Sequence, residues 1–321
     1  METTLYKPPT AEDLLHAADR IRPYVNRTPV LTSRTINRRL DAEVFFKCEN
    51  LQKVGAFKAR GATNAVLSLD ESLLSKGVAT HSSGNHAQAL SWAASLRGIP
   101  AFIVMPENSS RVKIEAVNEY GGIVSFCKPT LAAREETLKD IIDQTGATEI
   151  HPYNNLRIIA GQASAASELI TDIPDLDLIL APVGGGGLLS GTALAAYYFS
   201  PKTKIIAAEP ENANDAWQSF TRREFVPSLN PSTIADGLRT SLGTLTFPII
   251  LEHVHQIVTV SEESIIAAMR YIWERMKLLI ETSSAVPVAA LLENKVTIKG
   301  QRVGVIISGG NVDLDQLPWI K

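Results

Sequence analysis

The sequence predicts an α/β fold built on mostly parallel β-sheet. Along the chain, short apolar runs rich in β-branched residues alternate with polar or glycine-rich turns and with segments of helical periodicity. Parallel strands are buried on both faces, which explains their continuous apolar character, and helices form the crossovers between them. In such sheets ligands bind at the carboxyl ends of the strands. The residues that carry chemistry should therefore follow directly after the apolar runs.

The composition is that of an ordinary globular protein. The chain has 321 residues, of which 45% are hydrophobic and 20% charged, enough for one large domain or two moderate ones. A net charge of −3 provides no basic surface for nucleic acid or for an anionic membrane. Cys48 and Cys127 cannot form a disulfide framework, and the first residues lack the pattern of a secretory signal. We therefore expect a cytoplasmic protein.

Two early segments predict a small domain. GVATHSSGNHAQALSWAASLRG (77–98) and AFIVMPENSSRVKIEAVNEYGG (101–122) each read as a strand, a turn and a helix, and GIVSF adds a third strand. We expect residues 77–151 to form this small domain. Residues 1–76 and 152–321 would then form the large domain, into which the small one is inserted.

The large domain contains the stretch DLILAPVGGGGLLSGTALAAYYF (177–199). It is long and apolar enough to suggest a membrane span, but Pro182 and Gly184–Gly187 would break the helix and leave backbone groups unpaired in lipid. A buried strand, a turn and a helix explain the stretch better. Residues 203–220 repeat this pattern, and VGVIISGGN (303–311) supplies a late strand.

The four glycines can be interpreted as either of two binding sites. Successive N–H groups at a helix start bind phosphate, and a tight turn alone would need only one or two glycines. A glycine turn before a strand that ends in Glu209 also resembles a dinucleotide site, as in an NAD-dependent oxidoreductase. The GxGxxG spacing fails, however, because Leu189 or Ser190 stands where the third glycine belongs. We therefore favour a phosphate cradle.

Lys58 is a candidate reactive amine. It lies in VGAFKARGA (54–62), a stretch that is otherwise small and apolar apart from Arg60. Desolvation lowers the pKa of a lysine, and a neutral amine can form a Schiff base. The alternative is the start of an amphipathic helix with Lys58 and Arg60 in solvent, which is the commoner situation for lysine.

A polar turn follows the next predicted strand. Ser82, Ser83, Gly84, Asn85 and His86 open a helix there. Free N–H groups at a helix start, with hydroxyls and an amide beside them, make a good receptor for a carboxylate. The alternative is simple capping of the helix by one serine.

Two further strand ends carry polar groups. In EPENAND (209–215), Glu209 and Asp215 could bind a divalent cation together with a carbonyl group between them, unless the loop is merely a solvated acidic one. Ser308, after the last strand, could bond to the ring of a ligand or serve only as a turn residue.

One cofactor, pyridoxal phosphate, would use all these features together. It needs an amine for its Schiff base, a phosphate cradle, a partner for the pyridine nitrogen, a side chain against its ring and a receptor for the substrate carboxylate. The amine is Lys58, the cradle is Gly184–Gly187 and the partner of the pyridine nitrogen is Ser308. The side chain against the ring is Phe57, and the carboxylate receptor is the turn Ser82–His86.

The sequence resembles the fold-type II pyridoxal-phosphate enzymes of the serine racemase and serine/threonine dehydratase family. The resemblance implies a tryptophan synthase β-like fold, with large and small parallel-sheet domains and the active site between them. It extends over almost the whole chain, through the motifs FKARGA (57–62), SSGNHAQAL (82–90), AGQAS (160–164), VGGGGLLSG (183–191), AEPENAND (208–215), ADG (235–237), WERMKLLIE (273–281) and SGGNVDL (308–314).

The resemblance implies a role for each of these residues. Lys58 should carry the cofactor and act as the base on one face of the substrate Cα, with Ser83 as the acid or base on the other. Asn85 should bond the phenolic oxygen of the ring, Gly184–Gly187 the phosphate and Ser308 the pyridine nitrogen. A divalent cation, Mg²⁺ or Mn²⁺ or else Ca²⁺, should bind at three residues, namely Glu209, the carbonyl of Ala213 and Asp215.

The implied reactions are racemisation of serine and dehydration of L-serine or L-threonine to a 2-oxo acid and ammonia, in a homodimer. The substrate pocket should include Ser82, Ser83, Asn85, His86, Tyr153, Asn154, Arg157, Arg239 and Thr240. Since the two arginines could bind a second carboxylate, 3-hydroxyaspartate dehydratase, which would give oxaloacetate, is the alternative.

Two departures from the family pattern matter. ETSSAV (281–286) replaces the commoner EPS or EPT sequence, so the loop near the ring is altered. Val54 stands where animal racemases that respond to nucleotides carry a hydroxyl residue, so the sequence does not support regulation by ATP.

Overall fold

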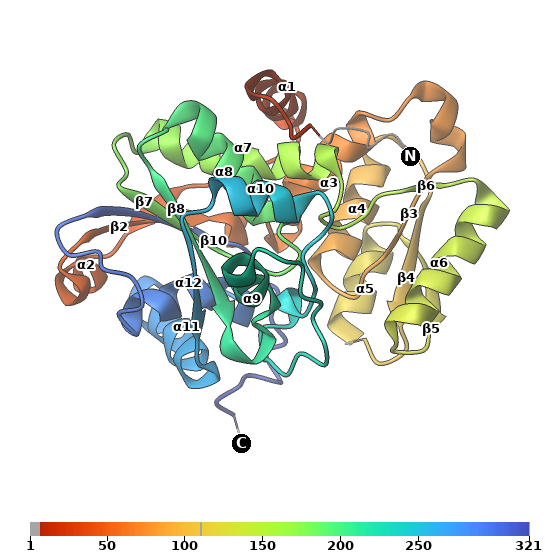
Figure 1. The fold of residues 1–321 in the computed structure, drawn as a ribbon. Coiled ribbons are helices and arrows are strands. Elements are labelled where there is room, and N and C mark those ends of the chain that lie inside the picture. The colour runs from red at the N-terminus through yellow and green to blue at the C-terminus, as the bar shows by residue number, and fades with distance from the viewer. Residues whose placement is uncertain (1–6, 110, 321) are drawn as a thin grey trace.

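The computed structural model describes residues 7–109 and 111–320, which fold around two β-sheets (Figure 1). The predicted α/β fold with parallel sheets is confirmed. Each segment that reads as strand, turn and helix in the sequence forms those elements, including the glycine-rich stretch.

The described strands of the larger sheet number six. All neighbours run parallel except β1, which pairs antiparallel with β2 at one edge. The last strand in the sequence is central, because Val305 pairs with Phe46 on one side and Leu180 on the other. In spatial order the strands are β1 (Val30–Thr32), β2 (Glu43–Cys48), β10 (Arg302–Ile307), β7 (Leu178–Pro182), β8 (Lys204–Pro210) and β9 (Gln256–Val260).

The smaller sheet is entirely parallel over the part of the chain described. Its strands lie inside the interval 77–151 that the sequence assigns to a small domain, although the domain boundaries themselves stay a prediction. In spatial order they are β5 (Ile123–Cys127), β4 (Ala101–Pro106), β3 (Val78–His81) and β6 (Thr148–Glu149).

Helices cover both faces of the larger sheet (Figure 1). On one face lie α1 (Ala11–Ile21), α7 (Leu156–Asp172), α8 (Gly187–Phe199) and α10 (Thr246–His253); on the other lie α11 (Glu262–Met276) and α12 (Thr282–Leu292). The short helix α9 (Asp215–Arg222) packs through Ala216 into the core on the first of these faces. The remaining helices are α2 (Arg34–Leu40), α3 (Lys58–Leu67), α4 (Asn85–Ser95), α5 (Arg111–Glu119) and α6 (Leu131–Thr145), with short 3₁₀ turns at η1 (Glu49–Leu51), η2 (Lys53–Gly55), η3 (Glu71–Lys76), η4 (Glu211–Ala213) and η5 (Asp236–Leu238).

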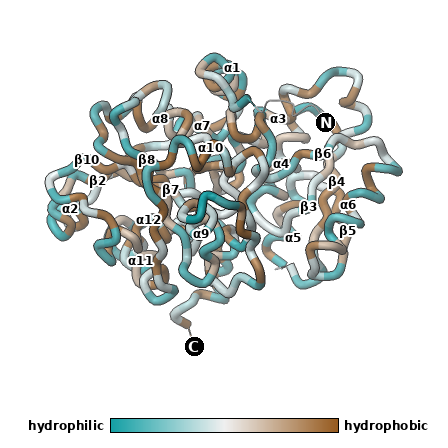
Figure 2. The backbone as a smooth tube through the Cα atoms, in the orientation of Figure 1, coloured by the Kyte–Doolittle hydropathy of each residue, from teal (hydrophilic) through white to brown (hydrophobic). Residues whose placement is uncertain are grey.

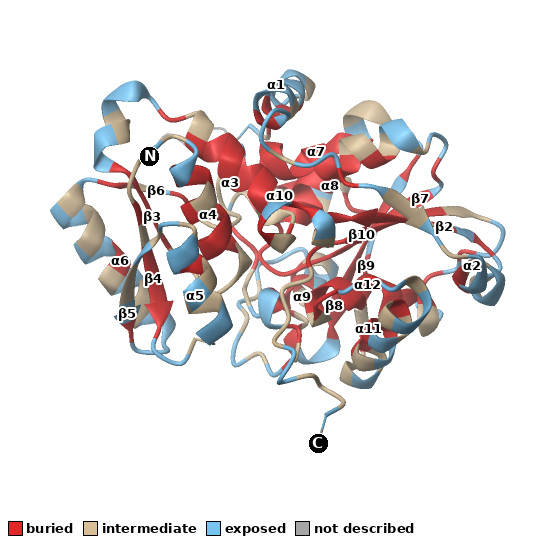
Figure 3. Ribbon diagram, turned by 180° about the vertical axis from the view of Figure 1, so that it is seen from behind, coloured by how far each residue is buried: buried red, intermediate tan, exposed pale blue. Residues whose placement is uncertain are grey.

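The central helix α8 explains why residues 177–199 carry so little charge. Its first ten residues are all buried, and Figure 3 shows it within the buried centre of the protein. At Gly191 a Cβ atom would lie 2.7 Å from the carbonyl oxygen of Ile159 in α7, so only glycine allows the two helices to pack this closely. Hydrophobic residues also predominate along the strands beneath it (Figure 2). Among the described residues, no helix is long and apolar enough to cross a membrane.

A buried ionic cluster fixes α3. Arg60 is fully buried and pairs with Glu49 through Nε (2.7 Å) and Nη2 (2.8 Å). The same guanidinium pairs with Glu168 of α7 through Nη1 and Nη2, each at 2.8 Å. Lys47, also fully buried, donates to Glu168 at 2.6 Å. The suggestion that Arg60 lies in solvent is therefore wrong, and the cluster joins β2, η1, α3 and α7.

Replacing Glu49 with alanine should destabilise the protein strongly, because it leaves the buried guanidinium of Arg60 with one carboxylate partner fewer. The free energy of unfolding, from urea titration, should fall by about 3–5 kcal/mol. As a control, Glu274→Gln removes the exposed i,i+4 ion pair with Arg270 and should leave the titration midpoint unchanged. Equal effects of the two substitutions would contradict this.

Candidate active site

The candidate site lies where the carboxyl ends of strands from both sheets meet. Strand β10 ends at Ser308, and the backbone before Lys58 pairs with it: Phe57 N donates to Ser308 O at 2.9 Å and Gly310 N to Gly55 O at 2.9 Å. This pairing sets the start of α3, and hence Lys58, beside the end of the central strand.

Lys58 has the environment of a reactive amine. Its Nζ donates to the carbonyl of Pro152 at 2.8 Å and lies 5.1 Å from the centroid of the Phe57 ring. Burial lowers the pKa of Lys58 to about 8, and the charge of Glu281 acts in the opposite direction. The alternative of a solvent-exposed Lys58 is wrong.

The polar turn after β3 leaves the start of α4 open. Gly84 occupies the N-cap position, and no side chain caps the helix. The hydroxyl of Ser82 accepts only a long bond, 3.4 Å, from Gly84 N, and Ser83 makes no side-chain hydrogen bond to any described residue. The alternative of simple serine capping is therefore wrong. The first turn of α4 and the Ser83 hydroxyl are both available to an anion.

His86 belongs to the same turn but is buried, with 2% of its surface exposed. Its Nε2 lies 2.9 Å from the carbonyl of Ile150, while Nδ1 has no partner. Burial, followed by the charge of Lys58, lowers the pKa of His86 to about 3. The ring is therefore neutral, with its proton on Nε2, and cannot offer a positive charge to a substrate carboxylate.

Two further histidines and an arginine lie nearby that the sequence reasoning missed. His81 ends β3, and its ring centroid is 6.4 Å from that of His151, which follows β6. Burial lowers the pKa of both, that of His151 to about 4, and the charge of Arg134 also lowers that of His81. The Nε of Arg134 is buried without a partner. These histidines could have been identified from the sequence, because His81 ends one predicted strand and His151 comes shortly after another.

Each glycine of Gly184–Gly187 is required by its surroundings. A Cβ at Gly185 would lie 2.3 Å from ring carbons of Tyr153, one at Gly184 2.9 Å from Leu238 Cα, and one at Gly187 2.9 Å from Tyr153 Cβ. Gly186 has φ +88°, and no side chain caps α8. The N–H groups of residues 184–186 donate to no described residue. The loop therefore has the close-packed, amide-lined form that a phosphate cradle requires.

Ser308 is 2% exposed, and its hydroxyl lies 2.9 Å from that of Ser284. Ser284 donates its only proton to Gly309 O at 2.6 Å, so Ser308 is the donor within the pair. Gly309 N in turn donates to Ser284 at 2.7 Å. In this arrangement the proton of Ser308 is directed at Ser284, so Ser308 would turn its hydroxyl to donate to a ring nitrogen.

Asn85 joins the two sheets across the site. Its Nδ2 donates to both oxygens of Glu281, at 2.9 and 3.1 Å, and its Oδ1 accepts from Nδ2 of Asn311 at 2.9 Å. Burial raises the pKa of Glu281 to about 7. The sequence reasoning gave Glu281 no role, although it lies within a matched motif.

The acidic residues after β8 are buried, so the alternative of a solvated loop is wrong. Glu209 is 0% and Asp215 3% exposed. Glu209 accepts from the backbone N–H groups of Ala216 (3.0 Å) and Trp217 (2.8 Å). Burial raises the pKa of both, well above the usual range for Glu209 and to about 6 for Asp215, although hydrogen bonding to Ser228 and to its own backbone acts in the opposite direction on Asp215. Described His, Cys, Asp and Glu residues form no cluster of three, so carbonyls such as that of Ala213 in η4 would have to complete a cation site.

The residues predicted to line the substrate pocket separate into two groups. Tyr153 packs on the glycine loop. Burial and the charge of Asp215 raise the pKa of Tyr153 to about 12, although its hydrogen bond with Thr240 acts in the opposite direction. Asn154 lies one residue further and accepts from Leu245 N at 2.8 Å. By contrast, the guanidinium of Arg239 donates to Thr233 O in an open pocket of ≈ 590 Å³.

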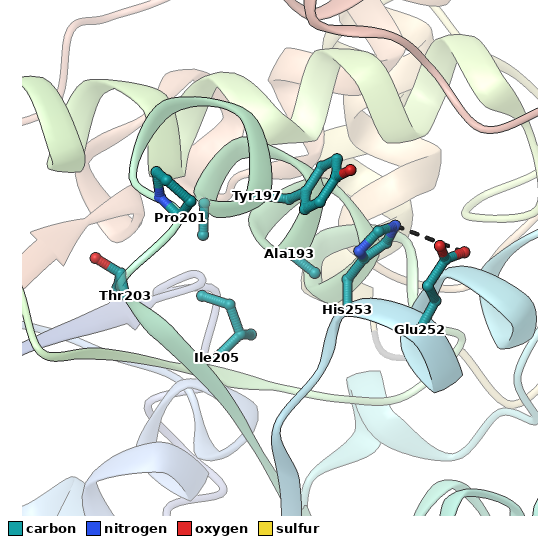
Figure 4. Close-up of a pocket in the computed structure, with 8 residues that line it drawn as sticks. Ala193, Tyr197, Pro201, Thr203, Ile205, Glu252 and His253 are labelled. Carbon is teal, nitrogen blue, oxygen red and sulfur yellow. Dashed lines mark ion pairs between the residues drawn. The ribbon is translucent and has the colours of Figure 1, made fainter.

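Arg157 is exposed on the first turn of α7, and within the described residues neither Arg157 nor Arg239 is hydrogen-bonded to Lys58 through its side chain. A second surface pocket, of ≈ 290 Å³, lies at the far end of α8 from the glycine loop (Figure 4). There the rings of Tyr197 and His253 face each other with centroids 4.6 Å apart. None of the predicted site residues lines this second pocket.

Comparison with known proteins agrees with this geometry. The family model "Pyridoxal-phosphate dependent enzyme" matches residues 21–309. A β-hydroxyaspartate dehydratase of Paracoccus denitrificans is 50% identical, over 97% of this chain and 99% of the relative. A serine racemase of Dictyostelium discoideum is also 50% identical, over 97% of each chain. A crystal structure of serine racemase from that organism has a TM-score of 0.90 and covers 95% of this chain and 99% of its own. A structure of maize serine racemase, 43% identical, has a TM-score of 0.94 and covers 96% of this chain and 95% of its own.

The pKa of Lys58 can be measured on the full chain freed of any bound aldehyde. Acetylation of Lys58, quantified by mass spectrometry across pH, should be half-maximal near pH 8 because only the neutral amine reacts. An ordinary lysine has a pKa of about 10.4. A midpoint for Lys58 near that ordinary value would show that the side chain is not desolvated.

Proposed function

The chain belongs to the pyridoxal-phosphate dependent enzyme family, and from this premise we propose that it acts at the Cα of a hydroxy amino acid, as a serine racemase and dehydratase. The main support is the position of Lys58, a desolvated amine between Phe57, the end of β10 and the polar turn after β3. The family match gives no support to the alternative of an NAD-dependent oxidoreductase.

The residues present fit the cofactor. The free N–H groups and close packing of Gly184–Gly187 suit its phosphate, Ser308 its ring nitrogen, Asn85 its phenolic oxygen and Phe57 one side of its ring. Lys58 would hold it covalently. When bound, the cofactor supplies an electron sink for the charge that develops at the substrate Cα.

The side chains of the site then divide the proton transfers between them. The first turn of α4 would hold the substrate carboxylate, which orients the Cα–H bond toward Lys58. Lys58, whose lowered pKa makes a larger share of it neutral near pH 7, would remove this proton. Return of a proton from Ser83 to the opposite face gives racemisation. Loss of the β-hydroxyl instead gives, after hydrolysis, a 2-oxo acid and ammonia.

A second substrate class has specific support. The relative from Paracoccus denitrificans is named as a β-hydroxyaspartate dehydratase, and its identity to this chain equals that of the serine racemase. Arg134, with its buried and unpartnered Nε beside His81, is better placed to bind a second carboxylate than Arg157 or Arg239. A panel of L- and D-serine, L-threonine and the 3-hydroxyaspartate isomers, scored for 2-oxo acid and enantiomer, distinguishes the two substrate classes.

We also propose that Glu209, the carbonyl of Ala213 and Asp215 bind Mg²⁺, Mn²⁺ or Ca²⁺. Two adjacent buried carboxylates with raised pKa values suit a hard cation. The homodimer remains a prediction from the resemblance, and the cytoplasmic location remains a prediction from the cysteine content. The absence of regulation by ATP remains a prediction from Val54.

The purified protein should show a visible absorption band that borohydride removes, since a conjugated imine to Lys58 is reducible. Lys58→Ala should lose both this band and measurable turnover. A colourless wild-type protein in the presence of added pyridoxal phosphate would overturn the proposed function. Turnover by Lys58→Ala at the wild-type rate would overturn the role of Lys58.

Ser83→Ala should separate the two reactions. Racemisation should fall by at least about 100-fold, because the proton donor on the second face is lost, while elimination from L-serine should stay within about threefold. Chiral chromatography and an assay for 2-oxo acid measure the two rates. An equal loss of both would argue against separate acids on the two faces.

Removal of the cation should be visible in both stability and activity. EDTA should lower the thermal midpoint by at least about 3 °C and reduce turnover, and Mg²⁺ should restore both, because a ligand that binds only the folded state stabilises it. In Asp215→Asn neither addition should have an effect. An unchanged wild-type midpoint with EDTA would count against the site.

A further inference from the structure

Glu281 is a buried carboxylate that the proposed proton transfers leave unused. It is 7% exposed and occupies the N-cap position of α12, yet its side chain does not cap that helix. Its backbone N–H donates to Gly309 O at 3.0 Å, and a Cβ on Gly309 would lie 2.8 Å from Glu281 Oε1. The carboxylate therefore lies against the end of β10, beside Ser308, and points into the site.

The hydrogen bonds around Glu281 have a fixed direction. The carbonyl of Val54 can only accept, so it receives a bond from Nδ2 of Asn311 at 2.8 Å. Nδ2 of Asn311 also donates to Oδ1 of Asn85, at 2.9 Å. The amide of Asn85 is thereby oriented with Nδ2 toward Glu281. The carboxylate is the acceptor at which this chain of bonds ends.

The charges that face Glu281 come from three other elements. Lys58 of α3 is influenced by the charge of Glu281, which opposes the effect of burial on that lysine. Asp236 of η5 raises the pKa of Glu281, and Lys113 of α5, ion-paired with Asp236, lowers it. The charge of Glu281 therefore acts on Lys58 and favours its protonated form.

We propose that Glu281 is a positioning residue that holds the Asn85 amide toward the cofactor and supplies the negative charge that balances Lys58. This inference rests on the proposed function for the role of Asn85. Each Nδ2 carries two protons, so Asn85 can keep one bond to Glu281 and give the second proton to the phenolic oxygen. Glu281 therefore sets which way Asn85 faces before the cofactor arrives.

Two substitutions separate charge from hydrogen bonding. Glu281→Gln keeps an oxygen that accepts from Asn85 but removes the charge, whereas Glu281→Leu removes both. Glu293→Gln is the matched control, because Glu293 is a part-buried carboxylate that accepts from Ser261 N and Oγ at 3.1 and 2.7 Å, outside the site.

The first measurement is the acetylation midpoint of Lys58 in the full chain without cofactor. In both Glu281 variants it should fall by about 1 pH unit, because loss of a nearby negative charge favours the neutral amine. Glu293→Gln should leave it unchanged. A purely structural Glu281 predicts no shift in Glu281→Gln, and that result would overturn the proposal.

The second measurement is the dissociation constant for pyridoxal phosphate, from titration of the visible band. Glu281→Leu should bind at least about tenfold more weakly, and Glu281→Gln within about threefold of wild type. Equal affinity of all three proteins would overturn the role in holding Asn85. If the wild type forms no band at all, the proposed function fails, whereas the acetylation midpoints still decide whether Glu281 balances Lys58.

Discussion

The ionic cluster around Arg60 is the constraint on which the site depends. Its guanidinium uses two carboxylates, one from η1 after β2 and one from α7, and Lys47 balances the remaining charge. Lys58 lies only two residues earlier in α3, so any movement of that helix would move the reactive amine. Because buried charges without partners are costly, the cluster allows one arrangement of these elements. The position of the Lys58 amine is therefore set by ion pairs that lie in the core, outside the site itself.

Around this fixed amine, the site is built largely from backbone. The segment before Lys58 pairs with the end of β10, the glycine loop offers its N–H groups and the start of α4 is uncapped. Side chains then refine these backbone positions, as Ser284 does for Ser308 and Asn311 does for Asn85. In this chain the loop ETSSAV contacts the end of β10 through the hydroxyl of Ser284.

The elements that local sequence patterns specify were predictable, and the contacts between distant segments were not. Apolar runs and the four glycines correctly predicted β7, the turn and α8, because burial and close helix packing can be recognised in the local sequence. The burial of Arg60 could not be recognised in this way, since VGAFKARGA is equally compatible with a surface helix. Glu281 was missed because its partner, Asn85, is 196 positions away. Arg239 was assigned to the pocket because family position does not reveal where a long side chain points.

The neutral histidines determine how the enzyme should respond to acidity. Histidine is the side chain that ordinarily changes charge between pH 5 and 8. Here burial lowers the pKa of His86 to about 3 and that of His151 to about 4, so neither changes charge in that interval. Activity should instead rise with pH through the pKa of Glu281, about 7, and that of Lys58, about 8, because both groups act in their deprotonated forms. The imidazoles of His86 and His151 therefore line the site as uncharged groups throughout this interval and do not act as pH sensors.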